Sequence, residues 1–252
     1  MTTRELWNRY AKYFNAEEGY IFPPDIPEYN FYKTIREEMP GLCLEIGAGA
    51  GRLAKYLSTQ DLTVALEPSK VMLKSWSDTS IKSASRLNAT GELMPFKDGL
   101  FPIVCFPYNG LQCVPDEKIR RGIVKEAYRV TACNGFFLLE VSPIFSRRDS
   151  EELTERYSVK MPDGSMLTLN ERVVRKFNPD LMNYQMFYTT STKNSSTTEE
   201  LHLNLAVTTR EGVINLLMEF GFVIVKQWGD YTRVPYNDKL SPRLLILARK
   251  GE

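Results

Sequence analysis

The sequence predicts an α/β fold in which helices wind around a parallel sheet and an extra β-rich lobe is inserted. Short apolar runs alternate with helical segments along residues 41–142, which is the pattern of a doubly wound sheet. Beyond residue 150 strand-like alternation broken by turn clusters takes over, until a helix and two strands close the chain. At 252 residues, one α/β body with an elaboration fits better than two independent domains.

The predicted sheet has seven strands. Each is a short apolar run that ends at Gly, Pro or a polar residue, as is typical of parallel strands buried on both faces. Five of these runs come before residue 142, and two follow the lobe. They are Leu42–Ile46, Leu62–Glu67, Ser85–Ala89, Phe101–Phe106, Gly135–Val141, Phe222–Trp228 and Leu244–Arg249.

The segments that connect these strands carry apolar residues at helical spacing. Ser69 and Asp116 are residue types that cap the start of a helix, and Gly221 is the type that commonly ends one. We therefore predict crossover helices on both sides of the sheet. They span Arg52–Ser58, Ser69–Ser77, Asp116–Val130 and Thr209–Phe220.

The N-terminal segment is rich in aromatic residues at helical spacing. Trp7, Tyr10, Tyr13 and Phe14 recur in this way before a proline-containing loop at Phe22–Pro27. Such a stripe either packs into the core or forms a lid over a ligand, and both interpretations stay open from the residues alone.

The predicted lobe combines alternating strands with three turn clusters. Tyr184, Met186 and Tyr188 share one face of a strand, where they either wall a pocket or pack the lobe. His202 lies opposite the leucines of its own strand, which makes it either a surface histidine or a catalytic one. The turn clusters are Pro162-Asp163-Gly164, Asn178-Pro179-Asp180 and Asn194-Ser195-Ser196. The expected organisation is a helical lid over residues 1–40, a sheet core over residues 41–142 and 209–252, and a substrate lobe over residues 143–208.

Composition and charge exclude several classes of protein. Lys and Arg number 32 against 31 Asp and Glu, so the formal charge of +1 provides no net attraction for a nucleic acid. No secretory signal and no apolar run of about 20 residues is present, so a soluble, cytoplasmic protein without a membrane span is expected. The four cysteines have no CxxC spacing and the chain has one histidine. We therefore expect buried, reduced thiols and no metal site.

The strongest functional signal is an apolar strand that runs into three alternate glycines and then into a helix. The segment Cys43–Leu53 reads CLEIGAGAGRL, with glycines at 47, 49 and 51. Glycine lets the backbone turn sharply and approach a ligand, and the helix start offers free N–H groups. A dinucleotide-binding motif would need its third glycine where Arg52 stands, which disfavours a nicotinamide cofactor.

These residues resemble the first motif of the class I S-adenosylmethionine-dependent methyltransferases, in which an acidic residue, here Glu45, precedes a hydrophobic residue and Gly-x-Gly-x-Gly. Glu67, at the end of the second predicted strand, is similar to the acidic residue of the second motif. The stretches Asn88–Asp98 and Phe106–Asp116 resemble the next two regions, in order and at normal spacing. The resemblance implies a Rossmann-like, seven-stranded core whose last strand is antiparallel.

The resemblance further implies that the chain binds S-adenosyl-L-methionine and releases S-adenosyl-L-homocysteine. Glu67 would accept hydrogen bonds from the ribose hydroxyls, or it is a strand-end carboxylate without a ligand. Asn88 stands where many relatives carry Asp, so it would contact the adenine through its amide oxygen. The expected cofactor-binding residues are Tyr13, Glu45, Gly47, Ala48, Gly49, Gly51, Glu67, Pro68, Met72, Asn88, Ala89, Thr90, Pro107 and Gln112.

Methyl transfer from a sulfonium mainly needs alignment of the reactants and exclusion of water, so we expect few catalytic side chains. Tyr10, Tyr13 and Phe14 are expected to fold over the cofactor, because an aromatic face attracts a cation. Gln112 is alternatively a structural amide, and Glu140 a plain strand-end carboxylate. The expected catalytic or positioning residues are Tyr10, Asn109, Gln112 and Glu140.

The lobe and the aromatic N-terminal helix together are similar to the small-molecule N-methyltransferases, including glycine-type and amino-sugar enzymes. This resemblance predicts a small-molecule acceptor with an amine nitrogen, and leaves a homo-oligomer open. O- or C-methylation, RNA methylation and an inactive, regulatory cofactor-binding protein are the alternatives. Neutral charge disfavours a nucleic acid, as does Phe106-Pro107-Tyr108-Asn109, which differs from the Asn/Asp-Pro-Pro-Tyr/Phe motif of adenine-methylating enzymes.

Overall fold

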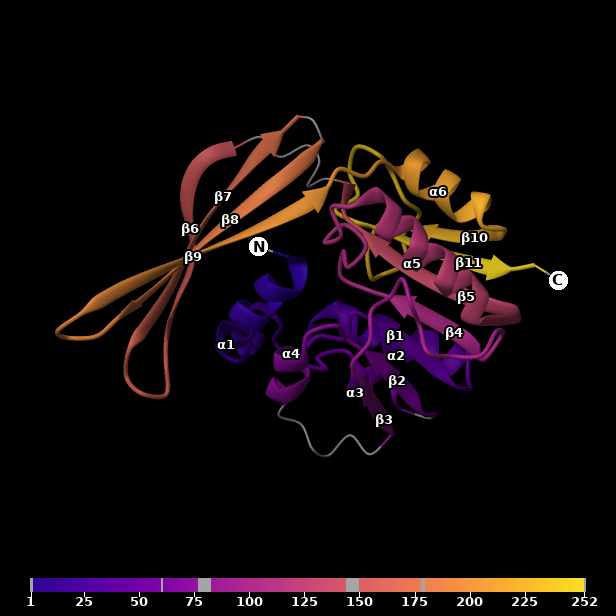
Figure 1. Cartoon of the computed structure of the whole chain (residues 1–252), viewed down its shortest axis with the longest axis horizontal. Coiled ribbons are helices and arrows are strands. Elements are labelled where there is room, and N and C mark those ends of the chain that lie inside the picture. Colours follow the sequence, from indigo (N-terminus) through magenta and orange to yellow (C-terminus); the bar gives the residue numbers. More distant parts are fainter. Residues whose placement is uncertain (1, 60, 77–82, 144–149, 178–179, 252) are drawn as a thin grey trace.

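The larger sheet of the protein has seven strands. The computed structural model describes residues 2–59, 61–76, 83–143, 150–177 and 180–251 (Figure 1). The strands of this sheet are β1 (Cys43–Ile46), β2 (Thr63–Leu66), β3 (Ala84–Leu87), β4 (Phe101–Phe106), β5 (Thr131–Val141), β10 (Phe222–Trp228) and β11 (Leu244–Lys250). Their order is β10-β11-β5-β4-β1-β2-β3, and β11 runs antiparallel to both of its neighbours. The predicted mostly parallel, seven-stranded sheet with an antiparallel last strand is therefore confirmed.

Helices cover both faces of this sheet. The helices are α1 (Thr3–Ile21), α2 (Pro27–Glu38), α3 (Ala54–Leu57), α4 (Lys70–Ser75), α5 (Glu117–Val130) and α6 (Arg210–Glu219). Ser69, Asp116 and Thr209 cap the starts of α4, α5 and α6 with their side-chain oxygens, as the sequence predicted for the first two. The predicted helix after the glycines begins later than expected, because its first residues belong to a turn.

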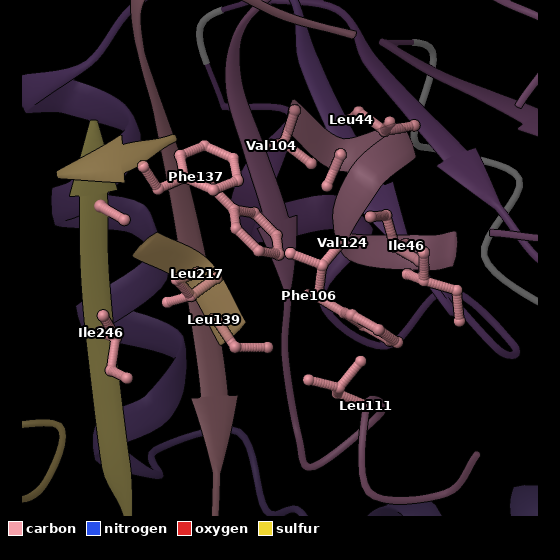
Figure 2. Packing of buried hydrophobic residues seen from close by; sticks show 14 of the residues in the cluster. Leu44, Ile46, Val104, Phe106, Leu111, Val124, Phe137, Leu139, Leu217 and Ile246 are labelled. Carbon is pink, nitrogen blue, oxygen red and sulfur yellow. The ribbon is translucent and has the colours of Figure 1, made fainter. Parts of the chain in front are cut away.

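Alternate strand residues divide the core into two layers. On one face Val104, Phe137, Leu139 and Ile246 pack against α5 and α6, with Leu217 of α6 among them (Figure 2). On the other face the intervening strand residues pack against α2 and α3. Helix α2 was not predicted separately from the rest of the N-terminal segment, although Pro27 in its first turn is a typical start signal.

The inserted lobe is a four-stranded antiparallel sheet. Its strands, β6 (Ser150–Lys160), β7 (Met166–Lys176), β8 (Leu181–Ser191) and β9 (Ser196–Ala206), pair in chain order. Two of the predicted turn clusters lie at the β6–β7 and β8–β9 connections. In the third cluster, Asn178 and Pro179 lie outside the described residues, as does Ser77 at the predicted end of α4.

Helix α1 lies between the lobe and the core (Figure 1), where it packs against β9 on one side and α4 on the other. Tyr13 joins the apolar face of the lobe and stacks on Tyr188 with 3.9 Å between ring centroids. Phe14 instead packs with Ala50 and Met72 of the core. The packing interpretation of the aromatic stripe therefore holds for both faces of the helix, and the lid interpretation stays a prediction.

All four cysteines are free thiols. Cys43 and Cys105 are buried in β1 and β4, and Cys113 is half-buried. The expectation of buried thiols is wrong for Cys133, which is exposed where β5 extends beyond its predicted start. Across the described ranges, no helix has both the length and the apolar character needed to cross a membrane.

Candidate active site

A cavity of about 630 Å³ lies where the carboxyl ends of β1, β2 and β4 meet α1 and the lobe. This is the point at which the chain order reverses, since β2 and β3 extend the sheet on one side of β1 and β4 on the other. Open α/β sheets bind ligands at such a switch point. The predicted site residues that line the cavity are Tyr10, Glu45, Gly47, Ala48, Gly49, Glu67, Pro68, Met72, Thr90, Pro107 and Asn109.

The glycine loop turns directly after β1. Gly47 and Gly49 have φ values of +71° and +57°, and the N–H groups of Gly47 and Ala48 both donate to the carbonyl of Leu66 at 2.8 and 3.0 Å. These bonds join the loop to the end of β2. Gly51, with φ +84°, does not line the cavity, because its place is against the ring of Trp76.

Glu67 joins the glycine loop to the start of α4. Its carboxylate accepts hydrogen bonds from Gly49 N at 3.0 Å and from Ser69 N at 2.7 Å, and the side chain is buried at the cavity wall. Burial raises the pKa of Glu67, and the two backbone N–H donors oppose that rise. A carboxylate offers about four acceptor positions, so about two remain for a ligand.

Two further oxygen atoms of cavity residues are buried and unpartnered in the part of the chain that the structure describes. They are Oε2 of Glu45, at the end of β1, and Oδ1 of Asn109, in the loop after β4. Burial raises the pKa of Glu45 well above its ordinary value. Buried polar atoms without a partner are rare in proteins, so both atoms mark places for ligand donors.

Arg52, at the position that disfavours a dinucleotide, is buried in a structural pair. Its guanidinium donates to the Glu28 carboxylate at 2.5 and 3.0 Å and lies 4.0 Å from the ring centroid of Phe22. Burial would lower the pKa of Arg52, but the charge of Glu28 outweighs it and the pKa is raised. Arg52 therefore ties α2 to the glycine loop.

The structure places Gln112 and Glu140 away from the cavity wall. Gln112 accepts a hydrogen bond from Ser142 N at 2.7 Å, and its amide nitrogen lies 3.4 Å from the Ser142 carbonyl. These contacts hold the chain at the point where it leaves β5 for the lobe. Glu140 is fully buried and accepts from the hydroxyls of Tyr32 and Tyr231 at 3.1 and 2.8 Å. These contacts match the structural alternative for both side chains.

Glu140 affects the cavity indirectly, through a hydrogen bond to the loop after β4. Its carboxylate accepts from Tyr108 N at 3.1 Å, and Tyr108 and Asn109 have φ values of +48° and +59°. Two consecutive non-glycine residues in the left-handed region are strained, and such strain is commonly found at functional sites. Arg243, 2.7 Å from the same carboxylate, balances its charge. Glu140 therefore holds the strained loop that carries Asn109 into the cavity.

Three other predicted cofactor residues lie outside the cavity wall. Asn88 donates through its amide nitrogen to the carbonyls of Glu67 and Pro68, both at 2.9 Å, so it supports the Glu67 loop from behind. Ala89 packs against the sheet core. The hydroxyl of Tyr13 donates to Glu199 of β9 at 2.6 Å, outside the cavity. His202, open as a catalytic residue from the sequence, is exposed beside Glu200.

Sequence reasoning missed several cavity residues from the lid and the lobe. Glu17 of α1 lies seven residues after Tyr10 and accepts the Tyr10 hydroxyl at 2.5 Å. The sequence signal that could have identified Glu17 is its separation of two helical turns from Tyr10, which puts both side chains on the same face of α1. Arg156 of β6 lines the cavity and donates to both oxygens of Glu171 at 3.1 Å. The wall on this side also contains residues that the sequence had singled out, Trp7 and Phe14 of the aromatic stripe and Tyr184, Met186 and Tyr188 of the lobe face.

Comparisons with known proteins agree with this architecture. A family model described as a methyltransferase domain matches residues 44–139. Comparison with curated protein sequences gave no match. The structure is similar to that of the CcbJ methyltransferase from Streptomyces caelestis, with a TM-score of 0.80, 13% identity and 100% of each chain covered.

Two further solved structures are similar along almost the whole chain. One is the sugar N-methyltransferase KedS8 from Streptoalloteichus sp, with a TM-score of 0.75, 17% identity, 96% of this chain and 92% of that chain covered. The other is CalS10, an amino pentose methyltransferase from Micromonospora echinaspora, with a TM-score of 0.73, 16% identity, 94% of this chain and 96% of that chain covered. At these identities the likeness concerns the fold.

The matched segment contains the loops that line the cavity on the side of the sheet. The glycine loop, Glu67 and the strained loop at Asn109 all lie within residues 44–139. Residues 44–139 therefore match a methyltransferase domain, and the whole chain has the fold of solved S-adenosylmethionine-dependent methyltransferases.

Proposed function

We propose that the chain transfers the methyl group of S-adenosylmethionine to an amine nitrogen of a small molecule. The observation that carries the proposal is the single cavity that connects the glycine loop and Glu67 to the aromatic face of the lobe. Its volume of about 630 Å³ lies within the range of small-molecule sites, roughly 300–1,000 Å³. Donor and acceptor would therefore meet in one space under α1.

The residues of the cavity fit the cofactor. Glu67 keeps free acceptor positions for ribose hydroxyls, and the unpartnered oxygen of Glu45 suits an ammonium group. Trp7, Tyr10 and Phe14 present aromatic rings to the same space, and such rings attract a sulfonium cation by about 0.5–2 kcal/mol. When bound, S-adenosylmethionine supplies an electrophilic methyl group that is transferred from its sulfur to the acceptor.

The protein's own part in the reaction is to orient the two reactants and keep water away. Alignment of two bound reactants lowers a barrier by about 7–11 kcal/mol, far more than a single side chain provides. Helix α1 closes the cavity on one side, and Met186 and Tyr188 of β8 close it on the other. The apolar wall also strengthens every charge interaction inside it.

An amine acceptor is favoured by a carboxylate in the cavity wall where α1 meets the lobe. The wall there carries the carboxylate of Glu17 among tyrosine hydroxyls, a combination that suits a cation or a nitrogen that becomes one. The sugar N-methyltransferase and the amino pentose methyltransferase that share this fold support the same class of acceptor.

Turnover on a panel of acceptors tests the proposal. We expect the purified protein to transfer labelled methyl from S-adenosylmethionine to small primary or secondary amines, and not to alcohols of the same carbon skeleton. Mass spectrometry of the products locates the methyl group. Methylation of the alcohols or of a short RNA instead of the amines would contradict it, as would tight cofactor binding without turnover of any amine.

Cofactor affinity is expected to rise as the pH increases through and above the range in which an ordinary glutamate titrates. Burial raises the pKa of both Glu67 and Glu45, so acidification neutralises them earlier than exposed glutamates. The ribose hydroxyls and the ammonium group bind the charged forms, so protonation weakens binding and binding releases protons. Calorimetry across this pH range, with Glu67→Gln and Glu45→Gln each removing part of the slope, is the measurement. A flat affinity profile in the unaltered protein would refute this.

A further inference from the structure

Glu17 is a buried carboxylate held by three tyrosines from two parts of the fold. Tyr10 of α1 donates to Oε2 at 2.5 Å, and Tyr188 of β8 donates to Oε1 at 2.7 Å. Tyr157 of β6 donates to the same Oε1. The Glu17 side chain is only 1% exposed, yet it belongs to the cavity wall together with Tyr10 and Tyr188. The three hydroxyls therefore connect the lid, the lobe and the cavity through one carboxylate.

The charge of Glu17 has no cationic partner in the described part of the chain. No ion pair of Glu17 with a Lys, Arg or His is found among those residues, and the Arg156 guanidinium in the cavity wall pairs with Glu171. A buried charge is costly unless it is paired, and neutral hydroxyls satisfy its hydrogen bonds but not its charge. A cation that enters the cavity would supply the missing counter-charge.

Glu199 provides an internal comparison. It also accepts a tyrosine hydroxyl between α1 and the lobe, from Tyr13 at 2.6 Å, but it lies outside this cavity and pairs with Arg9 and Lys12. Burial would raise the pKa of Glu199, but hydrogen bonds from Lys12, Tyr13 and Arg9 lower it to about 2. The contact between lid and lobe therefore does not itself require an unpaired carboxylate.

Tyr10 is the link between Glu17 and the space where the acceptor would lie. Burial, followed by the charge of Glu17, raises the pKa of the Tyr10 hydroxyl well above its ordinary value, so the phenol stays neutral. Its proton points to Glu17, which leaves the lone pairs of the Tyr10 oxygen for an N–H donor in the cavity.

We propose that Glu17 binds the acceptor nitrogen as a cation through Tyr10 and receives the proton that the nitrogen loses. The inference rests on the proposed methylation of an amine. The nitrogen gives a proton to the Tyr10 oxygen while Tyr10 gives its own to Oε2 of Glu17, which frees the nitrogen lone pair. The lone pair then forms its bond to the methyl carbon as the carbon–sulfur bond breaks and its electron pair stays on sulfur, so the methylated amine leaves as a cation and Glu17 ends protonated. Bulk water takes that proton when the lid opens.

Binding of a simple ammonium ion tests this without knowledge of the natural acceptor. Calorimetry in the presence of S-adenosylhomocysteine would compare cyclohexylammonium with cyclohexanol, a neutral molecule of similar shape. We expect the unaltered protein to prefer the cation, and Glu17→Gln to reduce that preference by about tenfold, the size of one charge-assisted hydrogen bond. Glu199→Gln is the matched control and should keep the preference.

Tyr10→Phe keeps the inference testable if Glu17→Gln does not fold. It leaves Glu17 with two tyrosines and removes the hydroxyl that reaches the cavity, so the cation preference should fall while S-adenosylhomocysteine still binds. With any amine that turns over, both variants should lose kcat mainly at low pH, where less free amine is present to carry out the attack.

The outcomes separate this inference from the proposed function. If the protein methylates amines but neither variant changes the cation preference relative to Glu199→Gln, Glu17 is structural and the inference is overturned. Absence of any preference for cyclohexylammonium in the unaltered protein overturns it as well. If instead no amine is methylated, the proposed function fails, whatever the binding data show.

Discussion

Glu67→Ala is expected to weaken binding of S-adenosylmethionine by about 100-fold. The carboxylate has two roles in the structure, since it holds Gly49 N and Ser69 N and keeps acceptor positions open to the cavity. Each hydrogen bond to a charged group contributes about 1.5–3 kcal/mol, and the substitution removes those to the ribose together with support for the glycine loop. Isothermal calorimetry with S-adenosylhomocysteine measures the change directly.

Two further variants show whether the loss of cofactor affinity in Glu67→Ala comes from the missing acceptor oxygens. Glu67→Gln keeps one acceptor oxygen and should fall between the unaltered protein and Glu67→Ala. Asp163→Ala is the control, because Asp163 also accepts a backbone N–H, that of Ser165 at 2.9 Å, but in a turn of the lobe outside the cavity. Unchanged affinity in Glu67→Ala would remove Glu67 from the cofactor site and leave it a strand-end carboxylate.

Gly51→Ala is expected to lower the free energy of unfolding by about 3 kcal/mol. The residue has φ +84°, which costs a non-glycine residue about 1–2 kcal/mol. A Cβ atom there would lie 2.2 Å from the ring of Trp76, which is buried, so the ring would have to move at a further cost of about 1–3 kcal/mol. Chemical denaturation monitored by circular dichroism measures the difference.

Gly164→Ala is a matched control for the backbone part of this effect. Gly164 has the same φ of +84° in the turn between β6 and β7, but no atom lies within 4 Å of the position its Cβ would take. It should therefore cost only about 1–2 kcal/mol. Equal losses in the two variants would show that the contact with Trp76 adds nothing and that backbone conformation alone requires glycine at position 51.

The fold was predictable because its determinants are local. Short apolar runs that are buried on both faces in β4 and β11, and helical spacing in α5, follow from the backbone geometry of each element. The glycine loop and Glu67 were predictable for the same reason, because a sharp turn after a strand needs residues of particular type at adjacent positions. The seven-stranded sheet with its antiparallel last strand was expected from the resemblance to class I methyltransferases, and the structure supplies the strand order.

Side-chain roles away from these turns were less predictable. Tyr10 and Tyr13 belong to one aromatic stripe, yet three residues of helical rotation place Tyr10 at the cavity and Tyr13 against the lobe. Gln112 lies after β4 and Glu140 lies near the end of β5, but their oxygens accept hydrogen bonds from Ser142 and Tyr231 and do not face the cavity. A residue's position along the chain places it near a site, whereas packing decides which way its side chain points.

The amino-acid sequence by itself determined a wound α/β core with a glycine loop after β1, an acidic residue after β2 and a separate β-rich lobe. Only the tertiary structure decided what lies opposite that loop, because Glu17 meets Tyr157 and Tyr188 across separations of 140 and 171 residues. Local patterns specify elements through the geometry of neighbouring peptide units. Contacts between distant residues depend on how whole elements pack, and the acceptor side of this cavity is built from such contacts.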